Sequence, residues 1–262
     1  MLAIQIVNRH GPRAVECLET PEPKPGADEV LIRVRAAGVS FPALLQSRGR
    51  YQLSPDFPFV PGAEISGEIL IAPPGSGYRV GDRVAVFTEL GGFADRATAA
   101  VERVLPLLAT TTFEQGAAFP LNYLTAYFGL IERGRMAAGE SALLQGAAGG
   151  SAAIQIAKAF GAGIVVAVTS TPAKGGVALR AGADAYVLAE GFKDAVLATT
   201  SPRDVDLVFD TAGDDRFIDS LRCPKDDGRL LAIGFAGGEI PSVKVNRLLL
   251  TNTSVIGVGL GA

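Results

Sequence analysis

The chain has 262 residues, 48% of them hydrophobic and 19% charged, which is enough to bury a sizeable core in one large or two ordinary domains. Its net charge of −3 is small and no basic stripe is present, which argues against nucleic acid as a partner. No apolar run is long enough to span a membrane, and two distant cysteines, Cys17 and Cys223, favour reduced thiols and a cytoplasmic location.

Short strands and turns make up the chain from its start to about residue 100. Residues 1–7 alternate in polarity and run at once into a turn, which indicates a first strand and not a signal peptide. In the segment 30–35, Val30, Ile32 and Val34 alternate with Leu31, Arg33 and Arg35 as the two faces of a half-buried strand do. Further strands are predicted at residues 63–71, 82–87 and 92–99. Regular short strands without long helices between them predict an antiparallel, barrel-like first domain.

The pattern changes near residue 111. Residues 113–119 and 121–133 have the spacing of helices, and short apolar runs then alternate with helical segments to the end of the chain. Six buried strands are predicted, at residues 142–145, 164–169, 185–188, 205–210, 229–233 and 254–259. This alternation predicts an α/β domain with a doubly wound parallel sheet, so we divide the chain into residues 1–114 and 115–262.

A cluster of glycines follows the first of these six strands. Gly146, Gly149 and Gly150 separate the strand from residues at helical spacing. Glycine lets backbone N–H groups at such a turn approach a pyrophosphate closely, and the following helix points its positive end at the anion. A turn that only packs a helix on the sheet is the alternative, because glycines also serve that purpose. We interpret the segment as a dinucleotide site.

The end of the next strand indicates which dinucleotide would bind. An NAD site usually has Asp or Glu at this position to hold the ribose 2′-hydroxyl. Here the strand ends in Ser170 and Thr171, and Lys174 follows shortly after. Hydroxyls beside a lysine suit a 2′-phosphate, which favours NADPH over NADH as the cofactor.

Six segments carry a resemblance to a known family and keep the family's order. They are residues 26–39, 59–67, 78–84, 121–126, 146–161 and 228–240. Together they resemble the medium-chain dehydrogenase/reductase superfamily, most closely its zinc-free, zeta-crystallin-like NADPH:quinone oxidoreductase branch. The resemblance implies a GroES-like antiparallel β-barrel domain followed by a Rossmann domain. It also implies hydride transfer from NADPH to a quinone or an α,β-unsaturated carbonyl compound.

The resemblance also identifies candidate site residues. Zinc-dependent relatives have a His at the position of Ala63 and a Cys near Ser40, and this chain has neither, so we expect no metal site. Ser40 and Tyr51 match positions that line the substrate cleft, where a hydroxyl can donate to a carbonyl oxygen. The alternative is that Ser40 caps a turn and Tyr51 packs on a loop. Thr125 is expected to contact the cofactor, and Gly234 with Phe235 to border the nicotinamide.

The chain departs from the family in three places. Ala43 stands where many relatives have Asp, which leaves the handling of protons open. Relatives carry two more residues, Val-Gly, after Gly150; because two helical residues correspond to about 200° of rotation, either the apolar face of the helix shifts or the turn is rebuilt. The chain stops after its sixth parallel strand, whereas relatives continue. An unpaired edge strand there predicts a homodimer through that strand.

Two other functions stay open from the sequence. One is an enoyl-thioester reductase, which is a related enzyme with a wider cleft for its substrate. The other is a catalytically weak dinucleotide-binding or structural relative, as the shortened glycine turn and Ala43 would allow. Substrate specificity depends on the shape of an apolar cleft lined by loops, which the sequence does not specify.

Overall fold

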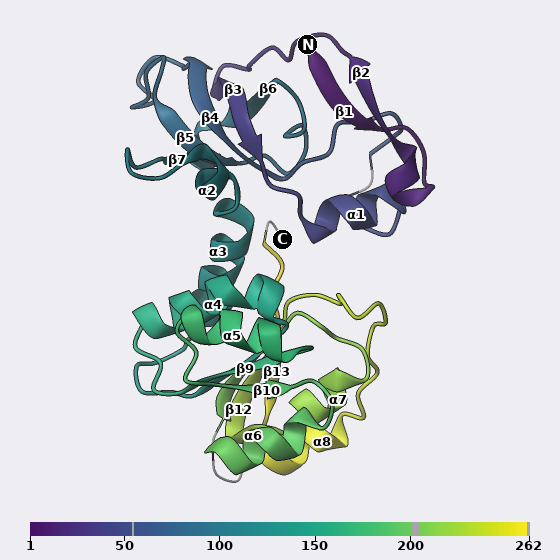
Figure 1. Ribbon diagram of the computed structural model, residues 1–262, viewed down its shortest axis with the longest axis vertical. Coiled ribbons are helices and arrows are strands. Elements are labelled where there is room, and N and C mark those ends of the chain that lie inside the picture. The colour runs from purple at the N-terminus through teal and green to yellow at the C-terminus, as the bar shows by residue number, and fades with distance from the viewer. Residues whose placement is uncertain (54, 201–204, 261–262) are drawn as a thin grey trace. The chain divides into compact units, whose positions relative to one another are not determined.

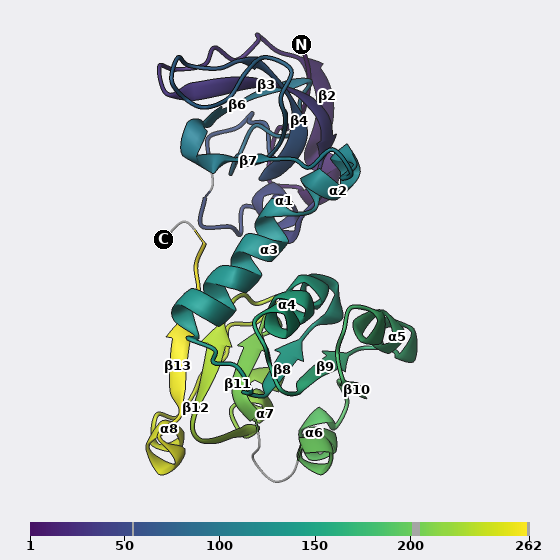
Figure 2. The same ribbon diagram turned by 90° about the vertical axis from the view of Figure 1, so that its left-hand side faces the viewer.

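The computed structural model describes residues 1–53, 55–200 and 205–260, with residues 147–149 described only as helical backbone. The chain forms two compact units, Met1–Leu121 and Asn122–Ala262, drawn in Figure 1 and Figure 2. The boundary after residue 114 that we infer from the sequence stays a proposal. None of the described helices is both long and apolar enough to cross a membrane.

Antiparallel strands build the first unit. Five of them pair in the order β6-β3-β4-β5-β7, and β1 pairs with β2 in a separate two-stranded sheet. The strands are β1 (Leu2–Ile6), β2 (Val15–Glu19), β3 (Glu29–Ala37), β4 (Glu64–Ile71), β5 (Arg83–Phe87), β6 (Arg96–Ala100) and β7 (Val104–Pro106). This architecture confirms the predicted antiparallel first domain.

The central strand β3 shows why this sheet forms. Val30 and Ile32 are fully buried in the core of the unit, whereas Arg33 and Arg35 are exposed. Both arginines pair with Glu68 on the neighbouring strand β4, at 3.8 and 2.8 Å. The predicted alternation is therefore confirmed from Ile32 to Arg35, with cross-strand ion pairs on the exposed face, whereas Leu31, predicted on that face, is buried.

The first unit also contains elements that the sequence pattern did not predict. These are the strands β2 and β7 and the short helix α1 (Phe41–Ser47). The strand predicted at residues 92–99 begins only at Arg96, because the backbone N–H groups of Gly92 and Phe93 donate to carbonyls of Gly62 and Pro61. Two further helices, α2 (Phe113–Ala117) and α3 (Pro120–Tyr127), follow β7.

A six-stranded parallel sheet forms the second unit, in the order β10-β9-β8-β11-β12-β13. The strands are β8 (Ala142–Gln145), β9 (Val165–Thr169), β10 (Ala185–Leu188), β11 (Val205–Asp210), β12 (Pro224–Ala232) and β13 (Ser254–Gly257). All six predicted strands are present, and the doubly wound α/β fold is confirmed. The strand order reverses between β8 and β11, which is where such sheets bind ligands.

Helices cover both faces of this sheet, as Figure 2 shows. The helices are α4 (Ala147–Ala159), α5 (Pro172–Arg180), α6 (Phe192–Thr200), α7 (Arg216–Ser220) and α8 (Asn246–Thr251), and a π-helical segment, Phe128–Arg133, continues α3. Leu144 packs with α4 and α5 on one face, and Leu143 packs with α6 and α7 on the other. Successive residues of one strand thus serve two cores, as expected for a sheet buried on both sides.

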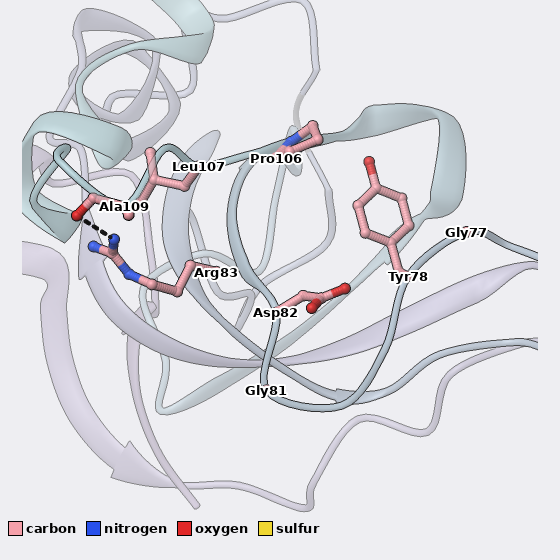
Figure 3. Close-up of a pocket in the computed structure, with 8 residues that line it drawn as sticks. All are labelled: Gly77, Tyr78, Gly81, Asp82, Arg83, Pro106, Leu107 and Ala109. Atoms are coloured by element: carbon pink, nitrogen blue, oxygen red, sulfur yellow. Dashed lines mark hydrogen bonds between the residues drawn. The ribbon is translucent and has the colours of Figure 1, made fainter.

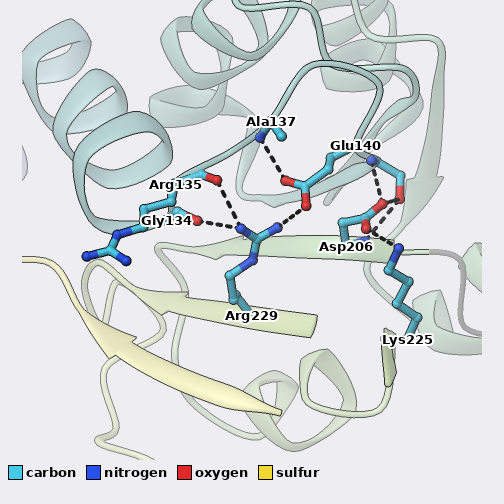
Figure 4. Close-up of polar contacts among 8 residues, drawn as sticks. Gly134, Arg135, Ala137, Glu140, Asp206, Lys225 and Arg229 are labelled. Atoms are coloured by element: carbon cyan, nitrogen blue, oxygen red, sulfur yellow. Dashed lines mark hydrogen bonds and ion pairs between the residues drawn. The ribbon is translucent and has the colours of Figure 1, made fainter. Parts of the chain in front are cut away.

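A polar network joins the loop before β8 to the amino ends of the strands (Figure 4). The guanidinium of Arg229 on β12 donates to the carbonyl oxygens of Gly134 and Arg135, at 2.8 and 3.1 Å, and pairs with Glu140. The second carboxylate oxygen of Glu140 accepts from the N–H of Ala137 at 2.9 Å. These hydrogen bonds tie the loop before β8 to the amino edge of the sheet. The candidate site lies at the opposite, carboxyl edge.

Candidate functional site

A single residue, Gly146, separates β8 from α4, so the predicted turn residues Gly149 and Gly150 lie in the first turn of the helix. Gly146 adopts a φ of 77°, which favours glycine, and a Cβ at this position would lie 2.9 Å from the Thr211 hydroxyl oxygen. No side chain caps the start of α4. Gly150 is buried, yet a Cβ there would meet nothing within 4 Å. The Gly150 N–H itself donates to the Gly146 carbonyl at 2.9 Å, so an anion at this helix start would need the N–H groups that precede it. Gly149 is one of residues 147–149, whose surroundings are outside the described part.

Helix α4 packs on the sheet with the apolar face that its sequence predicts. Ala153, Ile154 and Ala157 are fully buried in the core beside β8 and β9. Of the two alternatives for the shortened segment, we therefore infer a rebuilt turn ahead of a helix that keeps its packing face.

The predicted 2′-phosphate residues come together at the carboxyl end of β9. The Lys174 ammonium donates to the Ser170 hydroxyl at 2.9 Å. The hydroxyl of Thr171 caps α5 by accepting from the Lys174 N–H at 3.3 Å. Ser170 and Lys174 are both exposed, so their polar groups can also reach a ligand.

A second turn, after β11, lies directly beside the glycine turn. The hydroxyl of Thr211 donates to the carbonyl of Gln145, the last residue of β8, at 2.9 Å. Just before it, the buried carboxylate of Asp210 accepts from the N–H groups of Ala212 and Gly213, both at 2.8 Å. These residues were not predicted from the sequence, although Asp-Thr-Ala-Gly at the end of a buried strand is a local turn signal.

A third turn, after β12, contains the predicted residues Gly234 and Phe235 and pairs with the second turn. The N–H groups of Ala236 and Gly237 donate to the carbonyls of Thr211 and Ala212, at 3.1 and 2.8 Å. The N–H of Asp214 donates in return to the carbonyl of Glu239, at 3.2 Å. The contact is so close that a Cβ on Gly237 would collide with the Asp214 carboxylate. At the carboxyl edge, the second turn is therefore hydrogen-bonded on one side to the end of β8, just before the glycine turn, and on the other side to the third turn.

Thr125, another predicted cofactor residue, lies on α3 and outside these turns. It is half-buried on α3, and no side-chain hydrogen bond links it to the turns within the described residues. Its predicted contact with the cofactor stays a prediction.

The two predicted catalytic residues lie in the first unit. Ser40 occupies the N-cap position of α1 but makes no capping hydrogen bond, and its buried hydroxyl oxygen has no partner among the described residues. Tyr51 is half-buried, and burial together with the negative charge of Glu89 raises the pKa of its phenol. A phenol with a raised pKa stays protonated at neutral pH and can donate a hydrogen bond. Two hydroxyls in this unit are thus available as donors.

The segment around Ala63 bears on the expected absence of a metal site. Ala63 is buried just before Glu64. Catalytic zinc needs about three converging nitrogen, sulfur or oxygen ligands, and within the described residues no group of three or more His, Cys, Asp or Glu side chains is arranged to hold a metal. The absence of a metal site stays a prediction.

A surface hollow of about 480 Å³ also lies in the first unit, lined by Tyr78, Arg83 and neighbours (Figure 3). Its polar groups are already paired, since the Tyr78 hydroxyl donates to the Val104 carbonyl at 2.6 Å and Arg83 donates to three carbonyls and stacks on Phe113. Neither Ser40 nor Tyr51 lines it. We therefore do not regard this hollow as the reactive site.

Comparison with known proteins agrees with this geometry. Residues 26–109 match the alcohol dehydrogenase GroES-like domain, and residues 149–262 match the family described as zinc-binding dehydrogenase. Quinone oxidoreductase-like protein 2 of Rattus norvegicus is 34% identical over 95% of this chain and 75% of its own length. A probable oxidoreductase from Mycobacterium abscessus is 41% identical over all of this chain and 80% of its own, with a TM-score of 0.88.

A third relative was crystallised with a cofactor. The quinone oxidoreductase of Thermus thermophilus, whose structure includes a complex with NADPH, is 33% identical and covers 99% of this chain and 81% of its own, with a TM-score of 0.84. The chain therefore belongs to the quinone oxidoreductase branch of the medium-chain dehydrogenase/reductase superfamily, as its fold and its identity to these relatives show.

Proposed function

We propose that this protein is a zinc-independent oxidoreductase that uses NADPH to reduce a quinone or an α,β-unsaturated carbonyl compound. The observation that carries the proposal is the Lys174–Ser170 pair at the carboxyl end of β9, next to the uncapped start of α4. No Asp or Glu stands between Val165 and Lys174 to hold a ribose 2′-hydroxyl. The NADPH complex of the Thermus thermophilus relative supports the same choice of cofactor.

Each residue has a defined part in this proposal. The Gly146 turn and the start of α4 hold the pyrophosphate, and Lys174 and Ser170 hold the 2′-phosphate, because charge-assisted hydrogen bonds favour phosphate oxygens. Bound NADPH would supply the hydride. Ser40 and Tyr51 donate hydrogen bonds to the acceptor's carbonyl oxygen as it gains negative charge. We assign acceptor binding to residues 1–114 and dinucleotide binding to residues 115–262.

Two further parts of the proposal concern the protein's surroundings. We propose a homodimer formed through β13, since this strand is at one end of the parallel sheet and pairs only with β12 in the described structure. We also propose a cytoplasmic location, since both cysteines are unpaired. The partner is a small molecule, and neither nucleic acid nor a membrane enters the proposal.

Assays of NADPH oxidation with a 1,4-quinone, an enone and a crotonyl thioester test the function. We expect turnover with the quinone or the enone. Turnover with the thioester alone would instead identify an enoyl-thioester reductase. NADPH binding without turnover of any acceptor would indicate a catalytically weak relative, and absence of NADPH binding in a fluorescence titration would overturn the proposal.

Variants of the two hydroxyl residues extend the same assay. Ser40→Ala and Tyr51→Phe are each expected to lower kcat by about tenfold or more, because each removes a donor to the developing negative charge. Tyr78→Phe is the matched control, since it removes a phenolic hydroxyl that donates to the Val104 carbonyl in the same unit. Equal activity of Tyr51→Phe and Tyr78→Phe would remove Tyr51 from the mechanism.

A further inference from the structure

Asp210 is a buried carboxyl group for which the proposed chemistry has no role. It is 1% exposed at the end of β11, next to the point where the strand order reverses. One of its oxygens, Oδ1, accepts from two backbone N–H groups, and the other, Oδ2, has no hydrogen-bond partner among the described residues. Burial raises the pKa of this carboxyl, although the N–H groups of Gly213 and Ala212, the nearby Ser220 hydroxyl and the positive charge of Arg216 oppose the shift. Burying a carboxyl group costs free energy unless its hydrogen bonds offset the cost.

The contacts of Asp210 lead to all three turns of the carboxyl edge. Its carboxylate fixes the N–H groups of Ala212 and Gly213, which hold the second turn in shape. In the same turn, the Thr211 hydroxyl bonds to the last carbonyl of β8, just before the glycine turn, and the Thr211 carbonyl accepts from the third turn. The N–H groups that Asp210 holds lie in the turn whose Thr211 and Ala212 carbonyls accept from the third turn. A change at Asp210 is therefore expected to act mainly on the Gly234–Glu239 side.

The position of these contacts in the sheet says which part of the ligand they affect. A doubly wound sheet binds the two halves of a dinucleotide on either side of the point where its strand order reverses. Ser170 and Lys174 lie at the end of β9, on the side of the first half. Asp210 and the third turn lie at the ends of β11 and β12, on the side of the second half. They are therefore placed to support the nicotinamide and not the adenosine.

We propose that Asp210, acting through Thr211, is a positioning residue that shapes the nicotinamide half of the cofactor site by bonding the three turns into one unit. The inference rests on the proposed binding of NADPH. Asp210 itself is buried below the turns and acts through the backbone N–H groups that it holds.

The test compares Asp210→Ala with Asp210→Asn and uses two probes, NADPH and adenosine 2′,5′-bisphosphate. The alanine variant leaves two buried N–H groups without their acceptor, so we expect NADPH binding to weaken by about tenfold. The bisphosphate lacks the nicotinamide and should bind as in the wild type. Asn keeps one oxygen for the two N–H groups and places its amide nitrogen where Oδ2 has no partner to lose, so it should bind NADPH normally.

The outcomes separate this inference from the proposed function. If the wild type binds no NADPH, both are overturned. If the wild type binds NADPH and Asp210→Ala binds it equally well, only the positioning role is overturned. Equal weakening of NADPH and the bisphosphate in the alanine variant would indicate general damage to the unit and would also overturn it.

A second pair of variants covers the case in which Asp210→Ala does not fold. Thr211→Val has nearly the same shape but loses the hydroxyl that bonds to the Gln145 carbonyl, whereas Thr211→Ser keeps it. We expect the valine variant to bind NADPH several-fold more weakly and to raise KM for NADPH more than it lowers kcat. The serine variant should resemble the wild type. NADPH binding that is equal in the two variants would contradict the role of this link.

Discussion

At the scale of single residues, the proposed preference for NADPH depends on two exposed side chains. Lys174 and Ser170 are hydrogen-bonded to each other at the carboxyl end of β9, so the ammonium is already oriented before any ligand arrives. Thr171 adds to this order by capping α5 through the Lys174 N–H. Such preorganisation lowers the side-chain entropy lost when a phosphate binds.

The corresponding prediction concerns Lys174→Ala. Its loss removes a charged hydrogen bond to the 2′-phosphate, so NADPH should bind about tenfold more weakly. NADH has no 2′-phosphate, and its binding should not change. Lys174→Arg keeps the charge and serves as the control. Fluorescence titration with both cofactors measures the effect, and equal loss of NADPH and NADH affinity would contradict a 2′-phosphate contact.

The sequence predicted some of these residues and missed others for a physical reason. Ser170 and Lys174 could be identified because they follow a recognisable buried strand and are four residues apart. The role of Thr211 depends on a hydrogen bond to Gln145, 66 residues earlier in the chain. No local pattern contains that contact, because it exists only once β8 and β11 are paired in the sheet. The same holds for the unpartnered state of the Ser40 hydroxyl among the described residues.

At the scale of elements, burial decided which strands could be predicted. The central parallel strands β8, β9 and β11 stand out because they are buried throughout and contain runs of apolar residues. Strand β2 was missed because all its residues are exposed, so no face of it is marked by apolar side chains. The helix predicted at 121–133 changes to a π-helix at Phe128, where the Gly134 N–H donates to Gly129 five residues back. A Cβ at Gly129 would lie 2.8 Å from the Phe209 ring, a tertiary contact that the sequence does not reveal.

The amino edge of the parallel sheet contains a second ionic group, drawn beside Arg229 in Figure 4. Asp206 on β11 pairs with Lys225 on β12, and its other oxygen accepts from the N–H and hydroxyl of Ser141, at 2.9 and 2.8 Å. Burial raises the pKa of Asp206, but the hydrogen bonds from Lys225 and Ser141 outweigh it and hold the pKa below its ordinary value. The ionised carboxylate therefore stabilises the junction of three segments.

This arrangement makes the stability of the second unit depend on pH in a defined direction. Because the folded-state pKa of Asp206 is lowered, its contribution is fully present above the unfolded value of about 3.9 and is lost as pH falls through the lower folded value. Asp206→Asn should lower the melting temperature by about 3 °C at pH 7. The difference from the wild type should shrink as the pH drops below about 4.

A nearby acidic residue provides the control for this prediction. Asp227→Asn removes the same charge from an exposed position on β12, and Asn tolerates the φ of 64° found there. Thermal unfolding of both variants from pH 3 to pH 7 makes the comparison, and the control should follow the wild type. A constant difference between Asp206→Asn and the wild type over this range would contradict the lowered pKa.

At the scale of the whole molecule, the two edges of the parallel sheet are the places where a second copy of the chain could add a strand. The edges are β10 and β13, each of which pairs with one neighbour in the described structure. The segment that precedes β13 in the chain also exposes large apolar side chains. They are Ile240 at 77%, Val245 at 73%, Leu249 at 76% and Leu250 at 79% exposure. Unpaired strand edges and exposed apolar side chains are both features that favour self-association.

The proposed dimer through β13 predicts different effects of one substitution at the two edges. Val255 on β13 and Leu188 on β10 are similarly exposed, at 40% and 44%, so a glutamate should be tolerated at either position in the folded chain. In Val255→Glu, two copies paired through β13 would bring their introduced carboxylates close together across a two-fold axis, and like charges that face each other in neighbouring strands are destabilising. Light scattering at micromolar concentration should give twice the mass of one chain for the wild type and for Leu188→Glu, but the mass of a single chain for Val255→Glu. A wild-type monomer would refute the dimer, and a monomer with Leu188→Glu alone would move the interface to β10.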